Sequence, residues 1–336
     1  MPKLPVTPNA SHRSRSPLIS TQVPAAFDDA VVWAAWLYYA DQLNQNDVAE
    51  TMKVSRATVV NLLQEARETG VVNIRLRTDL MTRTVLAGRL VERFGLAEAL
   101  VIPSQGPETL ADRLGAAAAR FLADQLRPND VIGVAWGRTV LAAARTIALP
   151  DPISPLTVVQ VAGSSVSSED LSPELCTSLL ASRLGARCVN LLAPALLSSA
   201  ELRNRLLAEP MLLQQFELIH ATTKILFGIC DLRKTGTVRK SSFLPDAMID
   251  GYVERGARGV IISRFIGDGG RIVPGELDER MIGIELDALR SVPVRIAVAG
   301  GPAKHDAILA TLAGAYATHL VTDVETAARL VDAQLD

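Results

Sequence analysis

Short apolar runs alternate with longer amphipathic segments along most of the chain beyond residue 96. Runs at 131–136, 156–162 and 294–299 have the length of buried strands, and a segment with helical periodicity follows each of them. Strands that are apolar on both faces and are joined through helices assemble into parallel sheets. Residues 96–336 are therefore predicted to form an α/β domain with a mostly parallel sheet.

Residues 45–63 carry a different pattern, with apolar residues at spacings of three, four and seven on either side of a predicted turn near 52–54. These spacings predict two short amphipathic helices, and Ser55 has the position and the hydroxyl of a helix N-cap. Arg56, Thr58 and Asn61 fall on the face opposite the apolar stripe, and side chains of these types bond base edges or phosphates. The arrangement is that of a helix-turn-helix with its recognition helix. We assign DNA binding to Gln45, Ser55, Arg56, Ala57, Thr58, Asn61 and Arg75.

The chain divides into a tail, two domains and a linker. Residues 1–25 hold five prolines among serine, threonine and asparagine, and they are predicted to be a disordered tail. The helix-turn-helix domain spans 26–79 and begins with a helix at 27–43. At 71–77 it has a strand that is either a wing beside the recognition helix or an edge strand with solvated arginines. A linker helix at 80–95 leads into the α/β domain at 96–336, and two domains also fit the length of 336 residues.

Composition and charge exclude several classes of protein. No apolar run reaches the roughly 18 residues that a membrane span needs, and the N-terminal residues lack the apolar core of a secretion signal, so we expect a cytoplasmic protein without membrane contact. Cys176, Cys188 and Cys230 are predicted to be free thiols, and the four histidines have no metal-ligand spacing, so neither a metal nor a cofactor is predicted. The net charge of −2 excludes a chain that is basic throughout, and charge alone leaves nucleic-acid binding undecided.

Glycine and hydroxyl residues gather where the predicted strands end. In an open parallel sheet, ligands bind outside the carboxyl ends of the strands, beside the N-termini of the following helices. Arg138 and Lys304 favour an anionic ligand, whereas neither a dinucleotide motif nor a P-loop is present. We assign the binding of a small polar ligand to Gly137, Arg138, Thr139, Gly163, Ser164, Ser165, Asp268, Gly300, Gly301, Lys304 and Asp323. In an enzyme, Lys304 would instead form a Schiff base with an open-chain sugar, and Asp323 or Asp268 would move protons.

Motifs in both predicted domains carry a family resemblance. The N-terminal part contains, in order, Trp36-Leu37-Tyr38-Tyr39, Gln45, Val48-Ala49, Ser55-Arg56, Val59, Leu63, Ala66 and Gly70-Val71-Val72. The C-terminal part contains Trp136-Gly137-Arg138-Thr139, Gly228-Ile229-Cys230, Ala299-Gly300-Gly301-Pro302-Ala303-Lys304 and Thr322-Asp323-Val324-Glu325-Thr326-Ala327. On these motifs the chain resembles the SorC family of bacterial sugar-responsive transcription regulators, over about residues 30–332.

The resemblance implies a winged helix-turn-helix joined to an effector domain similar to phosphosugar isomerases and deaminases. Regulators of this kind are typically tetramers, and a sugar, polyol or sugar phosphate changes their binding to operator DNA. The chain has Val60 and Asn61 where relatives often have serine and arginine, and Thr223 followed by Lys224 where they usually have an aspartate. Cys230 replaces the last glycine of a Gly-Ile-Gly motif. The changes at 223–224 and at Cys230 are expected near the ligand pocket.

The sequence thus predicts a transcriptional regulator, a repressor rather than an activator, of a sugar or polyol catabolic operon. Its expected partners are double-stranded operator DNA, a small carbohydrate or phosphosugar effector, and further copies of the chain in a homotetramer. The alternative is a sugar-phosphate isomerase or deaminase with an appended helical domain. Turnover of a catabolite by the purified protein would distinguish the enzyme from the regulator.

Overall fold

The chain forms two compact units that divide between Leu76 and Arg77. The computed structural model describes residues 27, 29–72, 74, 84–164, 172–240 and 244–333. The tail predicted at 1–25 and most of the strand predicted at 71–77 lie outside the described residues, as do the predicted site residues Arg75 and Ser165. Within these ranges, no helix combines the length and the apolar character needed to span a bilayer.

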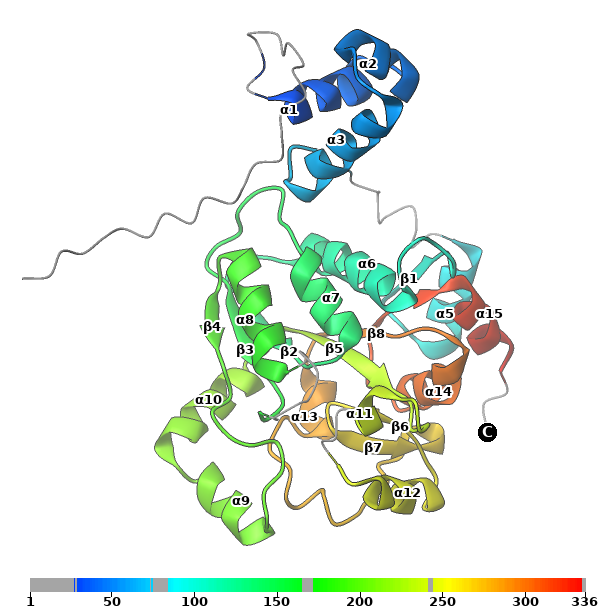
Figure 1. Cartoon of the computed structure of the whole chain (residues 1–336). Coiled ribbons are helices and arrows are strands. Elements are labelled where there is room, and N and C mark those ends of the chain that lie inside the picture. Colours follow the sequence, from blue (N-terminus) through cyan, green and yellow to red (C-terminus); the bar gives the residue numbers. More distant parts are fainter. Residues whose placement is uncertain are drawn as a thin grey trace, which may run out of the picture. The chain divides into compact units, whose positions relative to one another are not determined.

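The first unit is a group of short helices (Figure 1). α1 (Ala30–Ala35) continues into one π-helical turn, η1 (Trp36–Ala40), and is followed by α2 (Gln45–Met52) and α3 (Arg56–Glu68). The two helices predicted within 45–63 are α2 and α3. Asn44 caps α2 by accepting bonds from two backbone amides, and Lys53 ends it in the left-handed conformation, with φ of 53°. The buried core of the unit includes Trp33, Val48, Met52, Val59 and Leu63.

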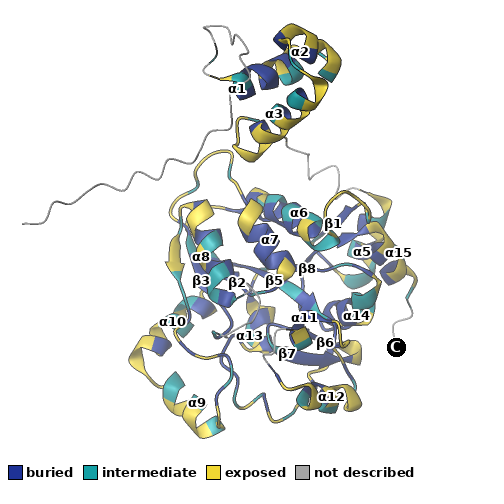
Figure 2. Ribbon diagram, viewed as in Figure 1, coloured by how far each residue is buried: buried dark blue, intermediate teal, exposed yellow. Residues whose placement is uncertain are grey.

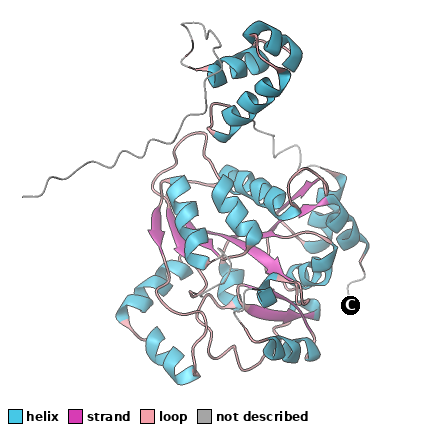
Figure 3. Ribbon diagram, in the orientation of Figure 1, coloured by secondary structure: helices cyan, strands magenta, loops and turns pink. Residues whose placement is uncertain are grey.

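The second unit is built around parallel strands (Figure 3). Their order is β1-β9-β8-β5-β2-β3-β4, and each neighbouring pair in this order is parallel. The strands are β1 (Glu98–Ile102), β2 (Val131–Val134), β3 (Thr157–Gln160), β4 (Arg187–Val189), β5 (Lys224–Cys230), β8 (Val294–Val298) and β9 (His319–Asp323). The predicted α/β fold with a mostly parallel sheet is therefore confirmed.

Helices cover both faces of this sheet, and its strands are largely buried between them, except for the mostly exposed edge strand β4 (Figure 2). The core on one face includes residues of α6 (Leu110–Gln125), α7 (Arg138–Thr146) and α8 (Pro173–Leu184). The core on the other face includes residues of α5 (Val85–Phe94), α10 (Pro210–His220), α13 (Leu286–Ser291), α14 (His305–Ala313) and α15 (Val324–Asp332). In β1, Leu100 and Ile102 join the first core while Ala99 and Val101 join the second, as the period of two in a strand requires. The helix predicted as a linker is α5, whose Ala87 and Leu90 are buried in the second core.

A small antiparallel hairpin extends from the sheet beside the end of β5. β6 (Ala257–Ile261) pairs with β5 and with β7 (Arg264–Gly267), and α12 (Asp246–Glu254) lies against β6. The remaining short helices are α9 (Ala200–Leu207), α11 (Thr237–Lys240), η2 (Asp268–Gly270) and η3 (Pro302–Lys304). The hairpin turn consists of Ile262 and Ser263, with φ of 45° and 65°. Neither residue type signals such a turn, which asparagine and glycine usually form, so the sequence did not predict the hairpin.

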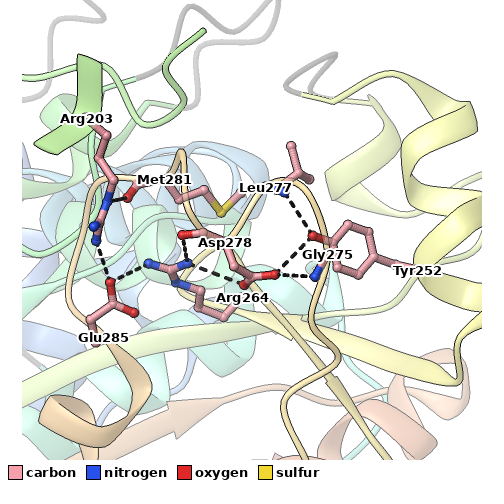
Figure 4. A network of polar contacts seen from close by, with 8 residues as sticks. All are labelled: Arg203, Tyr252, Arg264, Gly275, Leu277, Asp278, Met281 and Glu285. Atoms are coloured by element: carbon pink, nitrogen blue, oxygen red, sulfur yellow. Dashed lines mark hydrogen bonds and ion pairs between the residues drawn. The ribbon is translucent and has the colours of Figure 1, made fainter. Parts of the chain in front are cut away.

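A buried arginine holds this hairpin to the segment that follows it (Figure 4). Arg264 is only 4% exposed and donates to the backbone oxygen of Asp278 at 2.9 Å and to Glu285 Oε1 at 2.8 Å. The same Glu285 oxygen accepts a bond from Arg203 of α9 at 2.8 Å. Asp278 in turn accepts a bond from the Tyr252 hydroxyl of α12 at 3.2 Å. The network fixes the position of the turn formed by Ile262 and Ser263, because Arg264 follows it directly.

Candidate functional site

The chain changes direction across the sheet between β2 and β5, which are neighbours. After β2 it continues to β3 and β4 at one edge, and after β5 it continues to β8 and β9 on the other side. At such a switch point the loops diverge from the carboxyl ends of the two strands and leave a crevice, which is where ligands bind in open α/β sheets. A pocket of about 170 Å³ lies here, lined by residues that follow β2 and by the last residues of β5.

The pocket unites five of the predicted ligand-binding residues. Its lining consists of Leu110, Ala111 and Leu114 of α6, Gly137, Arg138 and Thr139 after β2, Gly228, Ile229 and Cys230 of β5, and Thr237, Gly300 and Lys304. Gly137, Arg138, Thr139, Gly300 and Lys304 come from two loops that lie far apart in the sequence. They meet because both loops leave the same edge of the sheet.

The N-terminus of α7 forms one wall of this pocket. Gly137 is its N-cap residue, with φ of 140°, a value that side-chain-bearing residues rarely adopt. It has no side chain to cap the helix, so the first amides of α7 remain available to a ligand. The Arg138 guanidinium donates to the Thr237 hydroxyl at 3.0 and 3.3 Å. The Thr139 hydroxyl donates to the carbonyl of Val298 in β8 at 3.3 Å. These bonds fix both side chains at the entrance of the helix.

The electrostatic character of the pocket is cationic. Arg138 and Lys304 are among the described residues that line it, and no carboxylate is. Burial raises the pKa of the Cys230 thiol, an effect that the positive charge of Lys304 opposes, so the thiol is neutral at physiological pH. Two cations beside the free amides of a helix N-terminus suit an anionic group such as a phosphate.

A smaller apolar cavity of about 20 Å³ adjoins this pocket and shares Gly228 and Cys230 with it. The turn residues Ile262 and Ser263 form part of its wall. A β-branched residue such as Ile262 rarely adopts a positive φ, and such strain tends to occur at functional sites. The Ser263 hydroxyl oxygen is buried and has no hydrogen-bond partner in the described part of the chain. The cavity therefore offers one unsatisfied hydroxyl in otherwise mostly apolar surroundings.

Asp323 has a different role from the one predicted for it. It is 1% exposed and is not among the lining residues of the pocket. Its Oδ2 accepts bonds from the Gly301 amide at 3.0 Å and from the Thr326 hydroxyl at 2.6 Å. Its Oδ1 accepts bonds from the Ser104 hydroxyl at 2.7 Å and from the first amides of α15. The carboxylate caps α15 and holds the 300–301 loop in place, so its action on a ligand is indirect.

Three further predicted residues lie outside the pocket. The Gly163 amide donates to the carbonyl of Ile282 at 3.0 Å, and the Ser164 hydroxyl donates to the carbonyl of Leu191 at 3.1 Å. Asp268 accepts two bonds from Arg258, at 2.7 and 2.9 Å, in an exposed ion pair. These contacts give Gly163 and Ser164 a packing role at the end of β3 and leave Asp268 on the surface.

The two departures from the family pattern that were expected near the pocket lie at opposite ends of β5. Cys230 lines the pocket, as expected. The expectation for Thr223 and Lys224 is wrong, because Lys224 begins β5 and thus lies at its amino end. Both side chains donate to Asp130 Oδ1, at 2.7 and 2.6 Å, within a buried ion pair.

Sequence reasoning missed several residues of the pocket. Thr237 was not predicted as ligand-binding although it lies after β5, and Gly228 was not predicted because it lies within β5 and not in a loop. Gly236-Thr237 opens the short helix α11, the same glycine-then-hydroxyl pattern that the sequence shows at strand ends elsewhere. This pattern could have identified Thr237 as a candidate ligand-binding residue. The α6 residues gave no signal, since apolar helix residues are usually core residues.

The α2–α3 pair presents a second candidate surface. Ser55 caps α3 by accepting a bond from the Thr58 amide at 3.1 Å, and its hydroxyl lies 2.8 Å from that of Thr58. Arg56 donates through Nε to the Gln45 side-chain oxygen at 3.2 Å, which ties the start of α3 to the start of α2. Arg56, Ala57 and Asn61 are exposed, and Gln45 and Thr58 are half-buried. Ser55 therefore has a structural role, while Arg56 is held in place at the surface.

Comparisons with known proteins agree on one family. A family model described as a "Putative sugar-binding domain" matches residues 79–332. The chain is 34% identical to the "Uncharacterized transcriptional regulator YjhU" of Escherichia coli K12, over 92% of this chain and 96% of the relative. It is 30% identical to the transcriptional regulator LsrR of Klebsiella pneumoniae, over 91% of this chain and 93% of that relative. A crystal structure of the full-length sorbitol operon regulator SorC from Klebsiella pneumoniae matches with a TM-score of 0.71 at 29% identity, covering 90% of this chain and 97% of that chain.

Proposed function

The chain belongs to the SorC family of bacterial sugar-binding transcriptional regulators, and we propose that it represses a sugar or polyol catabolic operon until a phosphorylated effector binds and relieves the repression. The observation that carries this proposal is the pocket at the switch point of the sheet, where Arg138 and Lys304 meet the free amides of α7. A phosphate carries more than one negative charge at neutral pH and accepts several hydrogen bonds.

DNA binding is assigned to the α2–α3 pair as a helix-turn-helix. The exposed side chains of α3 near its N-terminus include Arg56 and Asn61, which are suited to guanine and adenine edges in the major groove. The bond from Arg56 to Gln45 supports this role, because an arginine that is already oriented loses less conformational entropy when it binds. The predicted contribution of Arg75 from a wing remains part of the proposal.

Effector binding and operator binding are coupled through the assembled protein. We place the chain in a homotetramer that acts on operator DNA in the cytoplasm, and the effector favours the arrangement with the lower affinity for the operator. The effector shifts the equilibrium only by the difference between its affinities for the two arrangements. A phosphosugar that bound both equally would occupy the pocket without inducing the operon.

The enzyme alternative finds no counterpart among the relatives named above, which are regulators. The chemistry of the pocket agrees with this, since an isomerase needs a general base near the reacting carbons. Among the described residues that line the pocket there is no carboxylate or histidine to act as such a base, and burial keeps the Cys230 thiol protonated. Asp323 and Asp268, the two carboxylates considered as proton carriers, do not line it.

Thermal unfolding in the presence of pentoses, hexoses, polyols and their phosphates tests the effector assignment. We expect one phosphorylated compound to raise the Tm of the full-length protein, while its unphosphorylated counterpart does not. Lys304→Met is expected to weaken binding of that compound about tenfold or more, since it removes a charge-assisted bond. Lys234→Met is the matched control, because Lys234 is an exposed lysine outside the pocket lining. Equal losses in the two variants would refute the assignment.

A gel-shift titration against DNA from upstream of the regulated operon tests the DNA assignment. We expect Arg56→Ala to reduce affinity about tenfold at roughly physiological salt, within the range for an arginine that contacts a base. Arg67→Ala is the control, because Arg67 is exposed at the other end of α3. Unchanged affinity in Arg56→Ala at that salt concentration would show that α3 is not the recognition helix.

A further inference from the structure

The exposed face of α3 has an apolar centre. Val59, Leu63 and Ala66 are buried against the rest of the first unit. On the opposite side, steps of about 100° per residue place Val60 and Ala57 next to each other, between Arg56 and Asn61. Val60 is 40% exposed and is not among the residues that pack on either core of this unit. Two adjacent apolar side chains are thus flanked by two side chains that can bond base edges.

Helix stability does not account for a valine at this position. A β-branched residue loses side-chain freedom in a helix, and lysine, glutamate or alanine would favour the helix more. A single exposed apolar residue needs no explanation by itself. Val60 differs because it lies beside Ala57 and between two polar residues that are assigned to base recognition.

The charges along α3 indicate which part of the helix approaches DNA. Lys53 and Arg56 lie at its N-terminal end, where the helix dipole adds positive potential. In its last turns Glu65 and Glu68 outnumber Arg67, and the negative end of the helix dipole lies there as well. The N-terminal half of the helix is therefore the half that suits close contact with a duplex. Val60 belongs to that half.

We propose that Val60, together with Ala57, recognises the methyl group of a thymine in each half-site of the operator. The inference rests on the proposed DNA-binding function and adds a specificity determinant to it. The 5-methyl group of thymine is the apolar group that base edges offer in the major groove, and alanine or other aliphatic side chains contact it. Arg56 and Asn61 on either side would bond the neighbouring base pairs.

Replacement of single thymines by deoxyuridine tests the proposal, because it removes the methyl group and leaves base pairing unchanged. The probe is the duplex that the full-length protein selects from a random-sequence DNA library. Burial of one methyl group contributes about 0.8 kcal/mol, so uracil at the recognised position should weaken binding about fourfold per half-site. Val60→Ala should bind the thymine duplex more weakly by a similar factor and should lose most of its sensitivity to that uracil, because only Ala57 keeps its contact with the methyl group. Val253→Ala is the matched control, since Val253 is a valine of similar exposure, 44%, on α12 of the second unit.

Each outcome decides the question. A uracil penalty in the unaltered protein and in Val253→Ala that is much smaller in Val60→Ala supports the proposal. A penalty of equal size in Val60→Ala, or no thymine at which uracil matters, overturns it while leaving DNA binding intact. If the library yields no preferred duplex, the proposed DNA-binding function itself fails. Folding is not at risk, because the side chain of Val60 lies at the surface.

Discussion

Replacement of Asp323 by asparagine separates the structural role of this residue from a direct role in ligand binding. The carboxylate accepts five hydrogen bonds, from the Gly301 amide, the Ser104 hydroxyl, the amides of Glu325 and Thr326, and the Thr326 hydroxyl, at 2.6 to 3.2 Å. Asparagine keeps the shape but turns one acceptor into a donor and removes the charge. Whichever way the amide is oriented, at least one backbone amide faces an NH₂ group instead of an oxygen.

These contacts set the size of the loss in stability that we expect for Asp323→Asn. A hydrogen bond to a charged group contributes about 1.5–3 kcal/mol, and a buried donor left without a partner costs about 1–3 kcal/mol. One or two lost bonds and the weakening of the others give an expected loss of about 2–4 kcal/mol in the free energy of unfolding. The 300–301 loop is anchored by the same carboxylate, so effector affinity should fall as well.

The stabilisation by the Asp323 carboxylate depends on pH, and its direction follows from the pKa of this group. Burial by itself raises the pKa of Asp323, but hydrogen bonds from Thr326, Ser104 and Gly301 outweigh it, so the pKa in the folded protein lies below its ordinary value. A lowered pKa means that the ionised form is stabilised by folding. Its contribution is fully present above the unfolded-state value of about 3.9 and is lost as pH falls through the folded-state pKa. The stability gap between the unaltered protein and Asp323→Asn should therefore narrow below about pH 4.

Urea unfolding followed by circular dichroism measures the loss of stability in Asp323→Asn at neutral pH and its decrease at acidic pH. The relevant signal is the unfolding transition of the second unit. Thr322→Val is the control, since Thr322 is fully buried in β9 and its hydroxyl oxygen has no partner among the described residues. Loss of an unsatisfied hydroxyl should change stability by less than about 1 kcal/mol, or raise it. The reasoning is refuted if Asp323→Asn is within 1 kcal/mol of the unaltered protein at neutral pH, or if Thr322→Val costs as much.

Three other predictions concern residues of the second unit. Lys224→Met leaves the buried Asp130 carboxylate without the ammonium 2.6 Å away, so urea unfolding should show a loss of about 3–5 kcal/mol; a loss below 1 kcal/mol would contradict the pairing. Arg264→Met removes the donor that joins the β6–β7 hairpin to the segment after it, and limited proteolysis should cut between 262 and 285 faster than in the unaltered protein. Cys188 is exposed, whereas burial raises the pKa of the Cys230 thiol. Iodoacetamide at neutral pH should therefore modify Cys188 before Cys230, as measured by peptide mass mapping, and equal rates would show that Cys230 is open to solvent.

The fold class could be predicted because a strand that is buried on both faces does not alternate apolar and polar residues but is apolar throughout. The runs that became β2, β3 and β8 are continuous apolar stretches followed by amphipathic segments, a pattern that is typical of a covered parallel sheet. The β6–β7 hairpin was missed because Ile262 and Ser263 turn the chain in conformations that their types rarely adopt. Tertiary contacts, chief among them those of Arg264, hold that turn in place of local propensity.

The candidate ligand site could be predicted only in part. The rule that ligands bind at the carboxyl ends of strands identified Arg138 and Lys304, but it could not rank one loop above another. Asp323 illustrates the limit, because a carboxylate after a strand serves equally well as a ligand or as a helix cap. The spacing of Asp323 and Thr326 is that of a capped helix start and was a local hint. Ser104, the donor that completes the cap, lies 219 residues away.

The sequence by itself determined most of the helices and the strands of the parallel sheet, since periodicity and caps act over a few residues, but it did not determine the β6–β7 hairpin. It also determined the family, through motifs such as Trp136-Gly137-Arg138-Thr139 in a fixed order. The order of strands in the sheet was decided only by tertiary structure, because it depends on which helix faces fit together across long distances in the chain. That order makes β2 and β5 neighbours and so brings Arg138 and Lys304 to one pocket while Gly163 and Asp268 remain outside it.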